Sequence, residues 1–178
     1  MPAPDARIEV LFSAAEIAAR IALLAQEIAK DLGPDPLIVA ILKGSFIFAA
    51  DLARALHHAQ LRPEIEFITL SSYGADIKSS GTVELKRDIS ADPKNRRLLL
   101  IDDILESGRT LAYAKKEFID RGADVKTCVL LDKIGKRATE IDADYVGFTC
   151  PDRFVVGYGL DYAHYFRELP YIGTVEGR

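Results

Sequence analysis

Residues 98–111 read LLLIDDILESGRTL, and this stretch decides the expected fold. The apolar run from Leu98 to Ile101 does not alternate with polar side chains, which indicates a strand that is buried on both faces. Three carboxylates and a Ser-Gly turn follow, and the apolar residues after Thr110 recur with helical spacing. A buried strand that leads through a short turn into a helix is typical of a sheet with parallel strands.

The sequence on either side repeats this rhythm. Ser13 and Glu16 have the spacing of a capping box, which predicts a helix that Gly33 ends. The continuous apolar run Leu37–Leu42 predicts another strand buried on both faces. Further helices are expected at about 46–58 and 110–121, and further strands at 65–70, 125–131, 145–150 and 154–156. The pattern predicts an α/β fold with a mainly parallel central sheet flanked by helices.

Length and composition fit one domain that spans residues 1–178. The chain has 178 residues, of which 49% are apolar and 28% are charged, and these fractions favour a compact domain over a disordered chain. The polar stretch from Ser71 to Asp92 is long for a connection inside a compact domain. Such a stretch is usually a lid or a small hairpin, so we expect a mobile loop at about 71–92.

Charge, hydropathy and cysteine content exclude several classes of protein. The net charge of −4 argues against a protein that coats nucleic acid through a positive field. The longest apolar run, Leu37–Leu42, is far shorter than the ~20 residues of a membrane span, and the start Met1–Asp5 shows no secretory leader. Cys128 and Cys150 have apolar neighbours and no metal-ligand spacing, which favours buried free thiols in a cytoplasmic protein.

The turn from Ser107 to Thr110 is the candidate anion site. In parallel sheets, ligands bind at the carboxyl ends of strands, and the N–H groups at a helix start would hold a phosphate. Gly108 lets the backbone approach a ligand closely. The adjacent carboxylates Asp102 and Asp103 are costly to place together unless they meet a cation or hydroxyl groups. Taken singly, these residues are ordinary turn and capping residues, but their combination favours a ligand site.

Residues 102–110 resemble the phosphoribosyl pyrophosphate (PRPP) motif of the type I phosphoribosyltransferases. That motif has two acids, an apolar pair, an acid, Ser or Thr, Gly, any residue and Thr. The resemblance extends through nearly the whole chain: Lys43-Gly44 is similar to the pyrophosphate loop, and Ser72-Tyr73-Gly74 to the start of the active-site loop. Four further matches belong to the hypoxanthine-guanine branch, namely Lys133, the segment Phe154-Val155-Val156-Gly157-Tyr158, Asp161 and Arg167.

The resemblance implies a fold with a small hood formed by the chain ends. It also implies transfer of the phosphoribosyl group from PRPP to a 6-oxopurine, hypoxanthine or guanine, which gives IMP or GMP and pyrophosphate. The implied cofactor is Mg²⁺, and the implied assembly is a homodimer or homotetramer without nucleic-acid or membrane partners. The residues implied to bind PRPP are Asp102, Asp103, Ser107, Gly108, Arg109, Thr110, Lys43, Gly44, Ser72, Tyr73 and Arg167.

The purine side follows from the same resemblance. Lys133 is expected to donate to the exocyclic oxygen of the base, Phe154 to stack on the ring, and the backbone near Val155 to contact the remaining edge. Asp161 is expected beside the purine, where with Asp102 and Asp103 it would hold magnesium or its waters. Glu106 is the expected catalytic residue, a general base for the proton on purine N7.

Two positions depart from the family pattern, and two alternatives stay open. The family usually has Asp where this chain has Glu106, and purine-salvage relatives often have Glu where it has Asp102. The extra methylene moves the Glu106 carboxylate by about an ångström or more, on the scale at which general bases work. The alternatives are the same chemistry with xanthine or another base, and an RNA-binding regulator on the same fold. Against the regulator stands the lack of any basic run longer than a pair.

Overall fold

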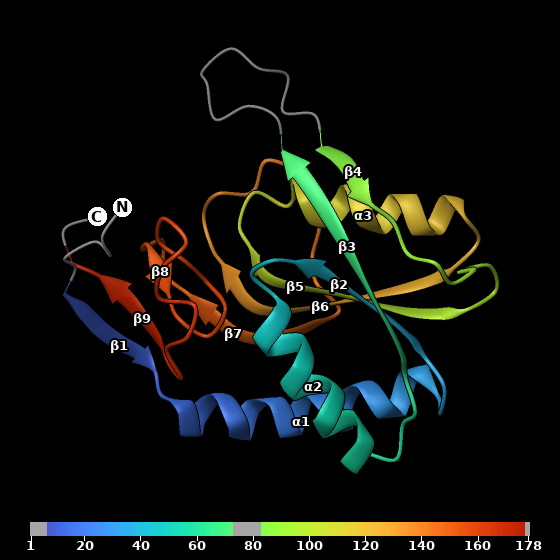
Figure 1. Ribbon diagram of the computed structural model, residues 1–178, viewed down its shortest axis with the longest axis horizontal. Coiled ribbons are helices and arrows are strands. Elements are labelled where there is room, and N and C mark those ends of the chain that lie inside the picture. Colours follow the sequence, from blue (N-terminus) through green and yellow to red (C-terminus); the bar gives the residue numbers. More distant parts are fainter. Residues whose placement is uncertain (1–6, 73–82, 177–178) are drawn as a thin grey trace.

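The computed structural model describes residues 7–72 and 83–176. Nine strands and three helices are present in this part of the chain (Figure 1). In chain order they are β1 (Ile8–Phe12), α1 (Ala14–Leu32), β2 (Leu37–Leu42), α2 (Phe46–His58), β3 (Glu64–Ser72), β4 (Val83–Arg87), β5 (Arg97–Leu105), α3 (Arg109–Asp120), β6 (Asp124–Lys133), β7 (Tyr145–Cys150), β8 (Val155–Val156) and β9 (Ile172–Val175).

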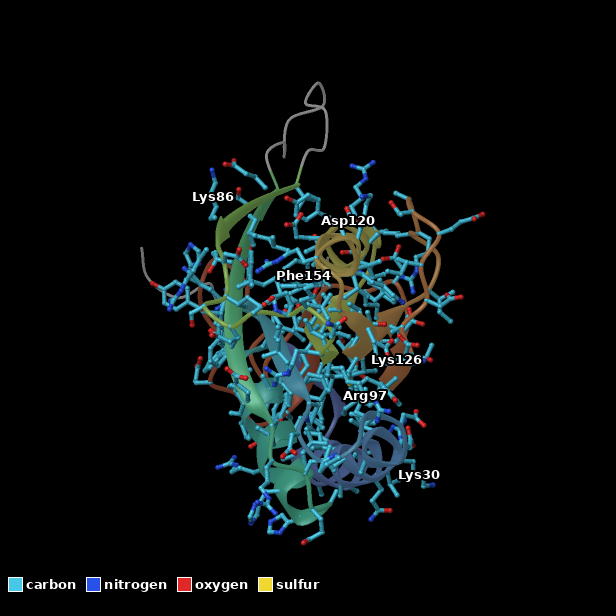
Figure 2. The ribbon with its side chains drawn as sticks, turned by 90° about the vertical axis from the view of Figure 1, so that its right-hand side faces the viewer. Lys30, Lys86, Arg97, Asp120, Lys126 and Phe154 are labelled. Carbon is cyan, nitrogen blue, oxygen red and sulfur yellow. The ribbon has the colours of Figure 1, made fainter. Side chains whose placement is uncertain are left out.

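Six strands form the central sheet in the order β4-β3-β2-β5-β6-β7. The five strands from β3 to β7 in this order are parallel to their neighbours, and only the edge strand β4 is antiparallel. Helices α1 and α2 cover one face of the sheet and α3 covers the other (Figures 1 and 2). The predicted α/β class with a mainly parallel sheet is confirmed.

The covered faces explain the apolar runs in the sequence. On β2, Ile38 and Ala40 pack in the core beneath α1 and α2, whereas Leu37 and Val39 pack in the core beneath α3. All four side chains are fully buried. A strand between two helical layers therefore needs apolar residues at every position rather than at alternate ones.

Helix α1 follows its sequence signals closely. The Ser13 hydroxyl accepts a hydrogen bond from the Glu16 N–H at 3.3 Å, and the Glu16 carboxylate accepts one from the Ser13 N–H at 2.9 Å. This reciprocal pair satisfies two donors at the helix start. The helix ends at Gly33, whose φ of 69° suits glycine.

A second sheet is built from the two ends of the chain. Strand β9 pairs antiparallel with β1 on one side and with β8 on the other. Figure 1 shows this small sheet beside the carboxyl ends of the central strands, and it forms the expected hood. Strands β1 and β9 were not predicted from the sequence, and β8 begins at Val155 rather than at the predicted Phe154.

The end of β5 also differs from expectation. The strand continues to Leu105 and does not stop at Ile101, so Asp102 and Asp103 lie inside the strand. The register explains this, because Asp102 pairs with Val129 and Leu105 with Asp132 of β6.

The structure also tests the expectations for the polar stretch after β3, for the cysteines and for membrane-spanning segments. Strands β3 and β4 pair as antiparallel neighbours, and residues 73–82 between them lie outside the described part of the chain. Cys128 and Cys150 are buried free thiols, as predicted. Within residues 7–72 and 83–176, no helix is long and apolar enough to span a membrane.

Candidate active site

Two neighbouring carboxyl groups lie near the end of β5. Asp102 is 7% exposed, and its Oδ1 accepts a hydrogen bond from the Asp103 N–H at 2.9 Å. Burial raises the pKa of Asp102 well above its ordinary value, and the adjacent Asp103 charge raises it further. Burial also raises the pKa of Asp103. Ionisation of the pair is therefore unfavourable unless a partner compensates the charge, which suits a cation or a hydroxyl-bearing ligand.

Ionising the buried Asp102 carboxyl costs folding free energy. We therefore expect Asp102→Asn to stabilise the ligand-free protein at neutral pH. The unfolded chain ionises this carboxyl near its ordinary pKa of 3.8, whereas the folded chain holds the proton to higher pH. Folding stability therefore falls as the pH rises from the unfolded pKa to the folded one, and asparagine removes that fall. In a chain of this size, Tm rises by about 2–4 °C for each kcal/mol relieved.

Thermal unfolding in magnesium-free buffer at pH 7 and at pH 4 measures this effect. The gain should be larger at pH 7, and Asp124→Asn, at an exposed position of β6, is the control. A lower Tm for Asp102→Asn at pH 7 would contradict the predicted charge cost.

The turn after β5 encloses a cavity of about 240 Å³. Helix α3 begins at Arg109, and its N-cap is Gly108, whose φ is 81°. The Ser107 hydroxyl accepts a hydrogen bond from the Arg109 N–H at 3.4 Å, but no side chain caps the helix at its N-cap residue. The first N–H groups of a helix lack partners within it and favour anions. The cavity is lined by Asp102, Asp103, Ile104, Leu105, Glu106, Ser107, Gly108, Thr110 and Leu111.

Two glycines bring the loop after β2 and the hood against this cavity. A Cβ atom on Gly44 would lie 1.6 Å from Asp103 Oδ2, and one on Gly159 would lie 2.1 Å from the carbonyl oxygen of Gly44. Gly159 also has a φ of 101°, which L side chains rarely adopt. Lys43 is exposed, and its peptide bond with Leu42 is cis. Close packing of backbone thus joins three predicted segments at one place.

Arg167 and Asp161 extend this group from the hood. Arg167 donates one hydrogen bond to the Gly159 carbonyl at 2.5 Å and forms an ion pair with Asp161 at 2.6 Å. The other Asp161 oxygen accepts a hydrogen bond from the His164 N–H at 2.8 Å. The Arg167 charge partly offsets the effect of burial on the pKa of Asp103. The structure therefore places a cation close to the β5 carboxyl pair.

Lys133 and Glu106 form an ion pair on another side of the cavity. Lys133 Nζ lies 2.9 Å from Glu106 Oε1 and 3.2 Å from Asp152 Oδ1, and its side chain is only 8% exposed. Burial alone lowers the pKa of Lys133, but hydrogen bonds to Glu106 and Asp152 outweigh burial and raise it. Lys136 also pairs with Asp152, at 2.9 Å. The lysine is thus held in its charged form beside the Glu106 carboxylate.

The aromatic residue of the predicted purine side remains accessible. Phe154 is 36% exposed, and its ring meets Tyr162 edge to face with centroids 5.5 Å apart. Figure 2 labels Phe154 among the side chains of the view turned by 90°. Val155 is buried, which leaves only its backbone for contact with a ligand.

The expected active-site loop at 71–92 is described except for residues 73–82. Ser72 is the last residue of β3, and Tyr73 lies outside the described residues. The contributions of both to PRPP binding stay predictions. Across 7–72 and 83–176, the structure contains no group of three or more His, Cys, Asp or Glu side chains with the geometry of a metal site.

Two residues that the structure places at the site were not predicted from the sequence. Asp152 follows the end of β7 and pairs with Lys133. Arg137 follows the end of β6, and its guanidinium donates to the carbonyl oxygens of Leu105 and Glu106 at 2.9 and 2.8 Å. Both residues follow the carboxyl end of a parallel strand, and this position is the sequence signal by which they could have been predicted.

A larger cavity of about 540 Å³ lies elsewhere, between α1, α2 and residues 168–170. Its lining is mostly apolar, with Ile17, Ile21 and Ile47 among its residues. The carboxyl pair, the turn and Glu106, which pairs with Lys133, all line the smaller cavity, which makes the smaller one the candidate site.

Comparison with known proteins identifies one family, and the similar proteins are phosphoribosyltransferases as well. The family model described as "Phosphoribosyl transferase domain" matches residues 9–163. The hypoxanthine phosphoribosyltransferase of Escherichia coli K12 is 40% identical over 172 residues, which cover 94% of this chain and 95% of the relative. The hypoxanthine-guanine phosphoribosyltransferase of Lactococcus lactis is 44% identical over 174 residues, which cover 97% and 93%.

Solved structures agree with these relatives. The hypoxanthine phosphoribosyltransferase of Trypanosoma cruzi in complex with its product IMP superposes with a TM-score of 0.89 at 37% identity and covers 99% of this chain and 98% of that one. The glutamic acid mutant from an analysis of an invariant aspartic acid in HPRTs superposes with a TM-score of 0.89 at 39% identity, covering 97% and 96%.

Proposed function

The chain belongs to the phosphoribosyltransferase family, and from this premise we infer that it is a purine-salvage enzyme that transfers the phosphoribosyl group of PRPP to hypoxanthine. The products are IMP and pyrophosphate. The observation that best supports this function is the cavity beneath the 102–110 turn, with the carboxyl pair of β5 on one side and the Lys133–Glu106 ion pair on another.

A direct assay tests this function. The protein is incubated with PRPP, Mg²⁺ and one purine at a time, and nucleotide and pyrophosphate are quantified. We expect IMP from hypoxanthine and GMP from guanine, with little product from adenine. Equal rates with adenine, or no IMP, would contradict the proposal. Xanthine is the competing base, since Lys133 and Phe154 suit any 6-oxopurine.

We propose that PRPP lies along the turn and the β5 carboxyl pair. The N–H groups from Ser107 to Thr110, with the hydroxyls of both residues, would hold the 5′-phosphate. Asp102 and Asp103 would accept hydrogen bonds from the ribose hydroxyls. The pyrophosphate would meet the Lys43-Gly44 loop and Arg167, which supply positive charge and backbone donors for the leaving group.

The carboxyl pair also fits magnesium. This ion prefers oxygen ligands and is usually held by one or two carboxylates together with substrate phosphates, so a cage of three protein ligands is not required. Asp102 and Asp103 would hold it. Both oxygens of Asp161 already have partners, and its contact with magnesium or its waters stays a prediction. When bound, the ion would neutralise the charge of the departing pyrophosphate.

The purine would occupy the space between Phe154 and the Lys133–Glu106 pair. Lys133 would donate to the exocyclic oxygen at C6, and Glu106 would take the proton from N7. This oxygen and N7 lie side by side on one edge of the base. The 2.9 Å separation of the two side chains matches that adjacency. Adenine would present an amino group to the ammonium, so the site would disfavour it.

The stacking role predicts that Phe154→Leu weakens purine use about tenfold in kcat/KM, because base–aromatic stacking is worth about 1–3 kcal/mol. The loss should appear in the KM for hypoxanthine rather than in that for PRPP. Phe154→Tyr is the matched control, since it keeps the ring. Steady-state kinetics measure both, and equal losses in the two variants would rule out stacking.

We further propose that the chain forms a homodimer or homotetramer in the cytoplasm. Phe46, Ile65 and Phe67 are large apolar side chains that are 44%, 42% and 37% exposed. Exposed apolar groups of this kind favour a protein interface. Buried free thiols favour a reducing compartment. Light scattering of the purified protein measures the assembly, and a monomer at micromolar concentration would contradict it.

A further inference from the structure

The guanidinium of Arg137 lies between the turn after β5 and the loop after β6. Its Nη1 is 2.9 Å from the Leu105 carbonyl oxygen, 2.8 Å from that of Glu106 and 3.4 Å from that of Lys133. Its Nε donates to the Ile141 carbonyl at 3.2 Å, and its Nη2 pairs with the Asp132 carboxylate. One side chain therefore joins the backbone of Glu106 to the backbone of Lys133.

The residues after Arg137 reinforce the same contact. The N–H groups of Ala138 and Thr139 donate to the Ser107 carbonyl at 2.9 and 3.1 Å. A Cβ atom on Gly108 would lie 2.7 Å from the Ile141 side chain and 3.0 Å from the Thr139 carbonyl oxygen. The 137–141 loop is thus packed directly on the turn that would hold the phosphate.

We propose that Arg137 is a positioning residue that sets the separation of the Glu106 carboxylate and the Lys133 ammonium. This inference rests on the proposed function, in which those two groups contact the same edge of the purine. The carbonyl oxygens of Glu106 and Lys133 accept hydrogen bonds from the same Nη1 atom of Arg137. A shift of either residue therefore stretches a hydrogen bond to a charged donor.

The contacts also explain why an arginine serves here. Arginine offers five N–H donors on three nitrogens in a rigid planar fork, whereas the donors of lysine all lie on one nitrogen and cannot reproduce the separate contacts of Nε, Nη1 and Nη2. All three guanidinium nitrogens are already bonded to this chain, and the side chain is 26% exposed. Arg137 therefore acts through Glu106 and Lys133 and does not itself hold a substrate phosphate.

The test compares Arg137→Ala and Arg137→Lys with the wild type and with Arg121→Ala. Arg121 is a matched control, because it is 27% exposed and pairs with Asp88 at 2.8 Å on another part of the surface. We expect both Arg137 variants to lose kcat roughly 10–50-fold, less than the ~10²-fold that misplacement by an ångström costs. The KM for PRPP should rise by no more than about threefold, because the N–H groups of Ala138 and Thr139 still hold the Ser107 carbonyl in these variants. Guanidinium ion should restore part of the kcat of Arg137→Ala only.

Amide hydrogen exchange supplies a readout that does not depend on activity. Arg137→Ala should speed exchange at residues 105–108, and Arg121→Ala should not. Unchanged exchange there, a kcat for Arg137→Lys equal to wild type, or equal kcat losses in Arg137→Ala and Arg121→Ala would overturn the positioning role. Failure of the wild type to make IMP would instead overturn the proposed function, and the exchange result would still decide the contact.

Discussion

Glu106→Gln is expected to lower kcat about 10²–10⁴-fold and to leave the affinity for PRPP within about threefold of wild type. The amide keeps the size of the side chain and an oxygen that accepts from Lys133, but it cannot take a proton from the purine. Only the transition state needs that proton transfer, so the loss should fall on turnover. Single-turnover kinetics with saturating PRPP and hypoxanthine, together with PRPP titration, separate the two quantities.

Two further variants sharpen this experiment. Asp152→Asn removes charge from the other carboxylate on Lys133, so it is the matched control and should change kcat far less. Glu106→Asp keeps a carboxylate on a shorter stem and should retain much more activity than Glu106→Gln. An equal decrease in turnover and in PRPP affinity for Glu106→Gln would contradict the assignment of Glu106 as the base.

Lys133→Met is expected to abolish most of the preference for hypoxanthine over adenine, by about 10²-fold in the ratio of kcat/KM values. A hydrogen bond to a charged group contributes about 1.5–3 kcal/mol, and the variant loses it with hypoxanthine while it removes the mismatch with adenine. Methionine preserves the length and the packing of the buried lysine stem. The ratio is measured with each base at saturating PRPP.

Lys136→Met is the matched control for this variant. Lys136 pairs with the same Asp152 but is 52% exposed. It should keep the ranking of the purines. An unchanged ranking in Lys133→Met would remove Lys133 from the specificity role, and a changed ranking in both variants would point to the net charge of the cluster rather than to one contact.

The elements that could be predicted are those whose signal is local. The capping box of α1 and the unbroken apolar run of β2 each lie within a few residues, and both elements were placed correctly. Strands β1 and β9 were missed because their stability comes from each other across the chain, as in the pairing of Ile8 with Val175. The end of β5 was placed too early because aspartate is rare inside strands.

The same difference between local and long-range signals decides which residues of the site could be predicted. The 102–110 motif is contiguous and could be identified from the sequence, and the structure places its carboxyl groups and turn around one cavity. The Glu106–Lys133 pair depends on the register of β5 against β6, in which Leu105 pairs with Asp132. The contacts of Arg137 depend on that register as well, and the position of Asp152 depends on the register of β6 against β7, in which Lys133 pairs with Cys150. No local pattern in the sequence sets either register.

The pairing of β9 with both β1 and β8 has a consequence for synthesis of the chain on the ribosome. Among the described strands, β9 is the one that holds the β8 segment next to Phe154. The end of β5 at Leu105 is translated 67 residues before Ile172, the first residue of β9. A nascent chain can therefore form the turn proposed to bind phosphate first, and the region proposed to receive the base is completed only when residues 172–175 have emerged.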